Sequence, residues 1–319
     1  MEGQLYYPIS NTLNQNHFVN LCRDLSILNS KNIEHTDRKG HVHGYMVNVT
    51  IIGASEQLFL FGTSPNSWKF RNSFRKWHAY RDLMFANAGV TKDELGRYGQ
   101  TIRPYLNEDH YDTELGTTSN TIAKPHNGLG FAFEGGEWNY SEFGVVPSYT
   151  VDPVTGISTL MQDSKLQIAD KFAVTILDDN SFDPVGGTEL HTSGAYKTCG
   201  MIHSYNLDRM EVVTPGADTI IDGPENPLSQ LISSGNQAVG VVIDVAGEQE
   251  LEEPPYDLAD DGDSIELITS AVARIPNTLA ITRTTMFVPA GLLRVRAEGT
   301  GTFKMMIDVV GEVLCKDIA

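Results

Sequence analysis

The sequence predicts an all-β protein of antiparallel sheets with a few helices. Apolar residues alternate with polar ones in short runs along most of the chain, such as "HVHGYMVNVTIIG" from residue 41 and "TFKMMIDVVGEVL" from residue 302. Glycine and proline separate these runs, as is typical of strands joined by turns. Roughly fourteen to sixteen runs qualify as strands, about twice the number in one eight-stranded jelly roll. The sequence therefore predicts two tandem eight-stranded antiparallel jelly rolls.

Two consecutive domains follow from this count. We expect a first jelly roll over residues 1–160 and a second over residues 161–319, divided where "DPVTG" and "DSKLQIADK" interrupt the strand pattern between residues 150 and 170. The strongly β-branched run "NQAVGVVIDVAGEQ", from residue 236, is typical of a strand buried on both faces.

Two segments have helical periodicity. Residues 16–29 space Phe18, Leu21, Cys22, Leu25 and Leu28 by three and four, which predicts a short helix. Residues 68–88 predict a longer helix inserted in the first domain, with Asn66 or Ser67 as its N-cap and Gly89 just after its end. One stripe of this helix is expected to be apolar. It contains Phe70, Phe74, Trp77, Met84 and Ala88, whereas Arg71, Arg75, His78 and Asp82 are expected on another face.

Composition limits the possible functions. The formal net charge of -18 and the pI near 4.8 argue against a general nucleic-acid binder, which needs a basic face. The first residues show no secretion signal, and three widely spaced cysteines, Cys22, Cys199 and Cys315, predict free thiols. These features predict synthesis in a reducing cytoplasm.

Motifs that carry catalysis are missing from the sequence. It contains no H-E-x-x-H, G-x-S-x-G, Walker loop or C-x-x-C. The segment "GLGFAFEGG" begins like a dinucleotide loop, but Phe133 stands where the last glycine is needed. We therefore predict no catalytic residue, no cofactor-binding residue and no enzyme activity.

Strand histidines and acidic clusters are the two kinds of position that could bind a metal ion. His41 and His43 would leave the same face of a strand, near His35, but exposed strand histidines are the simpler interpretation. Two acidic clusters could instead hold a structural calcium ion, which needs six to eight converging oxygens, or be solvated turns. The calcium candidates are Asp178, Asp179, Asp183, Asp260, Asp261 and Asp263; Asn180, Asp257 and Glu266 lie beside them.

The helix at 68–88 is basic in an acidic protein. Arg71, Arg75, Lys76 and Arg81 are predicted to contact carboxylates of the same or a neighbouring subunit, since arginine suits bidentate pairing at interfaces. Contact with an anionic lipid or genome surface is the alternative, because basic amphipathic helices also lie on membranes. Sequence-specific nucleic-acid binding is not expected.

The whole chain resembles the jelly-roll major capsid proteins of tailless icosahedral viruses. The features that carry this resemblance are the many short strands, the prominent helix "PNSWKFRNSFRKWHAYRDLMF" after the first hairpin, and long loops rich in proline and glycine. The length resembles the double jelly-roll kind found in membrane-containing bacteriophages. The chain departs from single jelly-roll capsids that begin with an arginine-rich arm, because its first Lys or Arg is Arg23.

The resemblance implies a virion protein that forms homotrimers and tiles into an icosahedral shell. Its implied partners are further copies of itself, minor capsid or vertex proteins and an inner membrane. The acidic segment 247–264, with Pro254 and Pro255, would lie outside or between neighbours, and the helix at 16–29 would face the interior. A β-sandwich carbohydrate-binding or adhesin module is one alternative. A cupin-like metalloenzyme using His41 and His43, with His191 or His203, is another.

Overall fold

The computed structural model describes most of both ends of the chain and parts of its middle. The described residues are 3–11, 14–87, 89–91, 101–115, 122–124, 138–144, 149–151, 158–160, 171–178, 181–182, 196–210, 259–260, 264–265, 267–277 and 280–316. Strands dominate them and most strand pairs are antiparallel, which confirms the expectation of a largely β protein with few helices.

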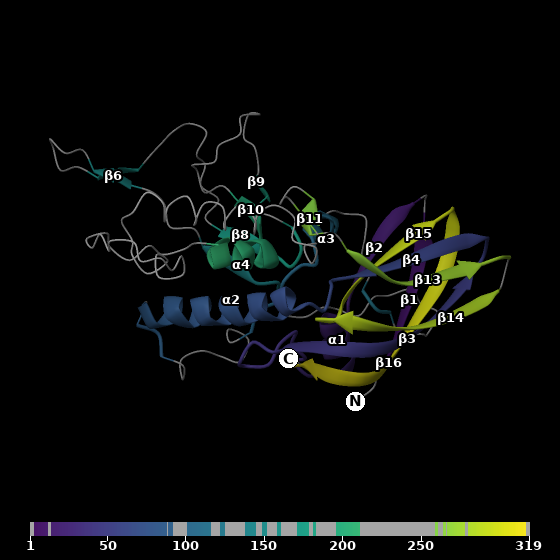
Figure 1. Cartoon of the computed structure of the whole chain (residues 1–319). Coiled ribbons are helices and arrows are strands. Elements are labelled where there is room, and N and C mark those ends of the chain that lie inside the picture. The colour runs from purple at the N-terminus through teal and green to yellow at the C-terminus, as the bar shows by residue number, and fades with distance from the viewer. Residues whose placement is uncertain are drawn as a thin grey trace, which may run out of the picture.

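Two four-stranded antiparallel sheets form a sandwich, on the right of Figure 1. The first sheet has the order β1-β16-β3-β14, and the second has the order β13-β4-β15-β2. The strands span Gln4–Asn11 (β1), Gln15–Asn20 (β2), Val42–Gly53 (β3), Gln57–Thr63 (β4), Ile268–Ile275 (β13), Ile281–Pro289 (β14), Leu292–Glu298 (β15) and Gly301–Cys315 (β16).

The strand pairs of the sandwich are nested. The first strand pairs with the last (β1 with β16), the second with the second last (β2 with β15), then β3 with β14 and β4 with β13. The eight strands therefore form four nested antiparallel pairs, as if one long hairpin had been folded over into two sheets. Its two halves come from the two ends of the chain, and the N- and C-terminal ends lie on the same side in Figure 1.

Residues 64–267 form an insertion between β4 and β13. Its described helices are α2 (Trp68–Asn87), α3 (Glu108–Leu115) and α4 (Met201–Met210). Its described strands are β5 (Glu142–Gly144), β6 (Tyr149–Val151), β7 (Ser158–Leu160), β8 (Lys171–Thr175), β9 (Ser181–Phe182), β10 (Tyr196–Gly200), β11 (Ala259–Asp260) and β12 (Ser264–Ile265). The eight sandwich strands thus come from both sides of the boundary expected near residue 160, and a second jelly roll remains a prediction.

The alternating runs of the sequence build the core of the sandwich. Inward side chains of both sheets pack together, including Val49 and Ile51 from β3, Phe59 from β4 and Ile307 from β16, all fully buried. Burying one such side chain stabilises the fold by about 1.5–3 kcal/mol. A second cluster lies between the end of the sandwich and the insertion, where Phe70 and Phe74 of α2 meet Phe18 of β2 and other apolar residues.

The helix expected at 16–29 begins only at Leu21. Residues 15–20 form β2, and α1 spans Leu21–Asn29, so the expectation was wrong for the first five residues. Asn20 ends the strand with an extended backbone and caps the helix, since its side chain accepts a hydrogen bond from the Arg23 backbone N–H at 3.1 Å. Helix α4 directly follows strand β10, at Met201–Met210.

The long helix α2 agrees with its expected ends. Ser67 caps it by accepting a hydrogen bond from the Phe70 N–H at 3.1 Å. At the other end Gly89 has a φ of +74°, and its N–H donates to Ala86 while the Val90 N–H donates to Phe85, which is a Schellman motif. His78 and Arg81 lie buried on the same side as Phe74 and Trp77, whereas the sequence placed His78 on a different face from this apolar stripe.

A glycine in the middle of the first sheet provides a test of its packing. A Cβ at Gly44 of β3 would overlap the Phe287 ring, so Gly44→Ala is expected to lower the free energy of unfolding by about 1–3 kcal/mol. Adding Phe287→Leu should recover part of this loss, because it removes the overlapping ring atoms. Chemical denaturation monitored by circular dichroism measures both effects.

Gly311 of β16 is the matched control. A Cβ there would meet nothing within 4 Å, so Gly311→Ala should change the free energy of unfolding by less than about 0.5 kcal/mol. Equal losses for the two glycine variants would contradict the packing described around Gly44.

Candidate functional site

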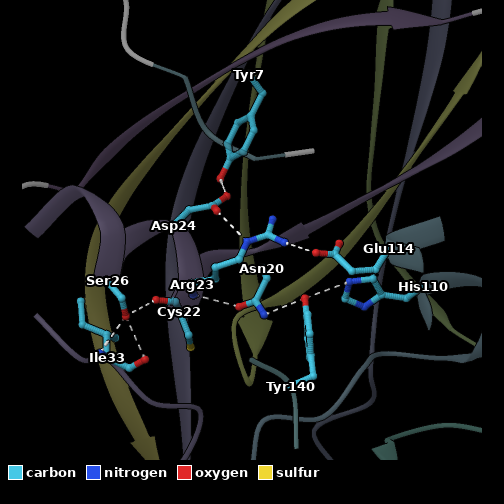
Figure 2. Close-up of polar contacts among 10 residues, drawn as sticks. All are labelled: Tyr7, Asn20, Cys22, Arg23, Asp24, Ser26, Ile33, His110, Glu114 and Tyr140. Carbon is cyan, nitrogen blue, oxygen red and sulfur yellow. Dashed lines mark hydrogen bonds and ion pairs between the residues drawn. The ribbon is translucent and has the colours of Figure 1, made fainter. Parts of the chain in front are cut away.

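A buried polar network joins the sandwich to the insertion and is the most elaborate polar site of the described residues. Figure 2 shows its members converging from β1, from the start of α1 and from α3. The network lies where β2 ends and α1 begins. At that point the Asn20 cap turns the chain, so that the side chains of Arg23 and Asp24 point into the space between the two parts.

An ion chain forms the centre of this junction. The Tyr7 hydroxyl donates to Asp24 Oδ2 at 2.6 Å, and Arg23 Nε donates to Asp24 Oδ1 at 3.0 Å. Arg23 Nη1 reaches Glu114 Oε1 of α3 at 3.0 Å. The sandwich thus supplies the phenol, the guanidinium and one carboxylate, and the insertion supplies the second carboxylate.

Burial governs the electrostatics of the ion chain. It raises the pKa of the Asp24 carboxyl even though Arg23 and Tyr7 oppose the shift, and it raises the pKa of Tyr7 well above its usual value. Burial lowers the pKa of Arg23, but Asp24, Tyr140 and Glu114 outweigh it and raise the pKa overall. Arg23 therefore remains charged, and the pair gains specificity at a high desolvation cost.

A second chain of hydrogen bonds runs beside the first. Asn20 Nδ2 donates to the Tyr140 hydroxyl at 3.1 Å, and that oxygen lies 3.3 Å from His110 Nε2. Because the Leu106 N–H donates to His110 Nδ1 at 3.1 Å, Nε2 carries the proton and donates to Tyr140. Burial keeps the pKa of His110 well below its usual value, so this histidine is neutral. Its ring stacks on Phe18, with centroids 4.9 Å apart.

A second buried ion pair lies nearby. Arg103 of the insertion pairs with Glu34 of the sandwich, and the Arg103 guanidinium lies over the Trp138 ring at 4.9 Å from its centroid. His35 donates from Nδ1 to the Ala290 carbonyl at 2.6 Å, and burial lowers its pKa to about 3. Two independent ion pairs therefore attach the insertion to the sandwich.

The arrangement joins the insertion to the sandwich through paired charges. The ionised groups of the junction face one another, and each is held by an oppositely charged or hydrogen-bonding neighbour. Burial also raises the pKa of the three thiols, Cys22, Cys199 and Cys315, which makes each a weaker nucleophile at neutral pH. All three cysteines are free, as the sequence predicted.

The predicted basic residues of α2 lie at different depths. Arg75 is exposed, Arg71 is half-buried and donates to the Asn66 carbonyl at 3.2 Å, and Lys76 donates to the Ser204 carbonyl of α4 at 2.8 Å. Arg81 is buried; its Nη2 lies 3.4 Å from His78 Nδ1, and burial lowers its pKa. The helix therefore uses Lys76 and Arg81 for contacts within the chain, and Arg75 is the most exposed of the four.

The calcium candidates are only partly within the described residues. Asp178 accepts a hydrogen bond from the Glu108 N–H and so stabilises the first turn of α3. Asp260 lies in β11, opposite Ser264. Asp179, Asp183, Asp261 and Asp263 lie outside the described residues, as do Asn180, Asp257, Glu266 and His191. Within the described ranges, no three His, Cys, Asp or Glu side chains gather as a metal site would require.

The strand histidines have carboxylate partners. His41 Nδ1 lies 2.9 Å from Asp37 Oδ2, and His43 Nδ1 lies 2.7 Å from Glu312 Oε1. His43, Glu34 and Glu312 line a cavity of about 410 Å³ at the end of the sandwich, and His203 is half-buried in α4.

Sequence reasoning missed the buried junction. Asn20 followed by Arg23 and Asp24 is a readable capping signal, and it would have ended the strand and begun the helix correctly. Nothing in the sequence links Arg23 to Glu114, or Glu34 to Arg103, because each pair is far apart along the chain.

Comparisons with known proteins bring no relative: no protein-family model, curated protein or solved structure matches the chain. Among the described residues, no helix is both long and apolar enough to span a bilayer.

The ion chain can be tested with one substitution. Arg23→Met leaves Asp24 charged and buried without its cation, so it should lower the free energy of unfolding by about 3–5 kcal/mol. Arg274→Met is the matched control, because Arg274 and Glu56 form an exposed pair that should contribute at most about 1 kcal/mol. Urea denaturation at neutral pH measures both. Similar losses for the two variants would contradict a special role for the junction.

Buried histidines make the fold sensitive to acid. Burial lowers the pKa values of His17 and His78 from 6.5 to about 4. The unfolded chain therefore binds more protons below pH 6.5, and stability present above pH 6.5 is lost as the pH falls toward 4. By about pH 5, each of these histidines should lower the free energy of unfolding by about 2 kcal/mol. The raised pKa of Asp24 opposes part of this combined loss.

His17→Gln removes the contribution of one of these histidines to the acid sensitivity. Between about pH 7 and about pH 5, the free energy of unfolding should fall by about 2 kcal/mol less for the variant than for the parent. Denaturation at both pH values measures this difference. A variant with the same pH dependence as the parent would exclude His17 as a source of acid sensitivity.

Proposed function

We propose that this protein is a self-assembling structural subunit, the major capsid protein of a tailless icosahedral virus. The observation that carries the proposal is the nested pairing of β1–β4 with β13–β16 in two four-stranded sheets. That pattern is the strand order of a jelly roll, an architecture that viral coats share with lectins and cupins.

The attachment of the insertion to the sandwich supports a coat subunit. A shell wall must keep its shape while neighbours press on it. Here the insertion is attached to the sandwich by an apolar cluster and by two buried ion pairs, Arg23–Glu114 and Arg103–Glu34. Such pairs favour a single geometry, because shifting the insertion would leave charges buried alone.

Finer features of the proposal come from the resemblance of the sequence. They are homotrimers, tiling into an icosahedral shell, minor capsid or vertex proteins as partners, an inner membrane, structural calcium and a location in the virion of a bacteriophage. A second jelly roll would have to use the chain between β4 and β13, where the run from residue 236 has the strongest strand pattern.

A β-sandwich binding module is the second candidate, and one observation favours it. The outer face of the first sheet carries a groove of about 630 Å³, and sheet faces are common binding surfaces in such modules. However, none of the residues lining this groove is aromatic, whereas stacking on sugar rings uses aromatic faces. The groove therefore fits a protein partner better than a carbohydrate.

The proposed function is tested by the assembly state of the purified full chain. We expect light scattering and negative-stain images to show trimers or shells. Assembly should increase from about 0.05 to about 0.5 M NaCl, because salt screens the repulsion between copies of net charge -18. EDTA should reduce assembly if calcium bridges the subunits. A chain that stays monomeric at every salt and protein concentration would overturn the proposal.

A further inference from the structure

The outer face of the sheet β1-β16-β3-β14 is unlike the rest of this acidic protein. Register places Thr285, Asn48, Asp308 and Gln4 in one row across the four strands. Arg283, Thr50, Met306 and Tyr6 form the next row, followed by Ile281, Ile52, Lys304 and Pro8. A groove of about 630 Å³ runs over these rows. The face is therefore hollowed and lined mostly by short neutral side chains.

Charge and apolar exposure on this face both indicate an interface. Its outward strand positions carry only three charged side chains, Arg283, Lys304 and Asp308, although the whole chain has a net charge of -18. The flanking apolar side chains are unusually exposed: Ile281 by 59%, Val310 by 63%, Val313 by 50% and Met46 by 36%. Depletion of charge together with exposed apolar groups is typical of surfaces that bind protein.

Opposite charges stand on either side of the centre of the face. Arg283 on β14 and Asp308 on β16 are separated by β3, where Thr50 and Asn48 lie between them. Two strand spacings and an offset of two residues along the strands place their Cα atoms about 12 Å apart. Among the described residues, neither has an ion-pair partner.

We propose that this face binds the same face of a second copy across a two-fold axis. An axis parallel to the sheet and passing over β3 brings each Arg283 onto Asp308 of the other copy, so one operation forms two ion pairs. The same operation turns the exposed Ile281 of each copy toward the groove of the other. Such self-complementarity is the defining property of an isologous contact.

The size of the face agrees with one contact among several in an assembly. Four strands about 4.8 Å apart and about nine residues long present about 600 Å² per copy, or about 1,200 Å² in total. That total lies at the lower limit of specific interfaces, about 1,200–2,000 Å². The inference rests on the proposed function, because it names the surface through which subunits of a shell would meet.

Charge reversal tests the contact in the full-length protein. Both side chains are exposed, so Arg283→Asp and Asp308→Arg should fold like the parent, as checked by thermal denaturation. Each variant alone should weaken self-association at least about tenfold in analytical ultracentrifugation, because it places like charges opposite each other twice. Arg274→Asp, an exposed change of the same sign on the other sheet, is the matched control and should associate like the parent.

A mixture of the two variants gives the decisive result. The Arg283→Asp variant has two acids at these positions, and the Asp308→Arg variant has two arginines. A dimer with one copy of each variant therefore regains both ion pairs. The mixture should associate to within about threefold of the parent, and native mass spectrometry should show pairs containing one copy of each variant. Single variants that associate like the parent, or a mixture no better than its components, would overturn this contact while leaving the proposed function standing. A parent protein that never self-associates would overturn both.

Discussion

The pairing of the first four strands with the last four is the constraint on which the rest of the structure depends. β1 cannot find its partner until β16 exists, so the sandwich closes only when both ends of the chain meet. The pair β4–β13 must also close over residues 64–267. The entropy of closing a loop grows only with the logarithm of its length, by about 0.6 kcal/mol for each doubling, so a long insertion is tolerated thermodynamically. The same non-local pairing makes folding slow, since contacts distant in sequence must form together.

A long insertion that is tolerated still has to be oriented. The apolar cluster around Phe18 and Phe74 supplies attraction, but apolar contacts tolerate sliding. Arg23 and Arg103 do not, because each must face a carboxylate from the other part of the molecule or remain buried alone. The polar junction therefore sets the geometry that the apolar cluster stabilises. This division of roles explains why charged residues are placed where apolar ones of the same size could be equally stable.

The sequence predicts the elements better than their partners. Alternation of apolar and polar residues predicted β3 and β16, because an inward and an outward face impose a period of two. The helical spacing from Phe18 to Leu28 concealed the change from strand to helix at Asn20, since strand β2 contributes apolar residues of its own. His78 was expected on a different face from the apolar stripe of α2, yet it is buried, with Thr36 Oγ1 2.8 Å from its Nε2. That contact, like the nested pairing, links residues that are not adjacent in sequence, and no local pattern encodes it.

The negative charge is distributed unevenly along the chain. The segment 247–264 has eight acids and no lysine or arginine, so a large part of the charge of -18 belongs to one short stretch of the insertion. Under the proposed function, repulsion between these acids would keep copies apart in dilute solution. The outward positions of that sheet, with Arg283 and Asp308 balancing each other, can approach a second surface without a large desolvation or repulsion cost. The proposed contact between copies thus uses a sheet whose strands do not include the acidic segment 247–264.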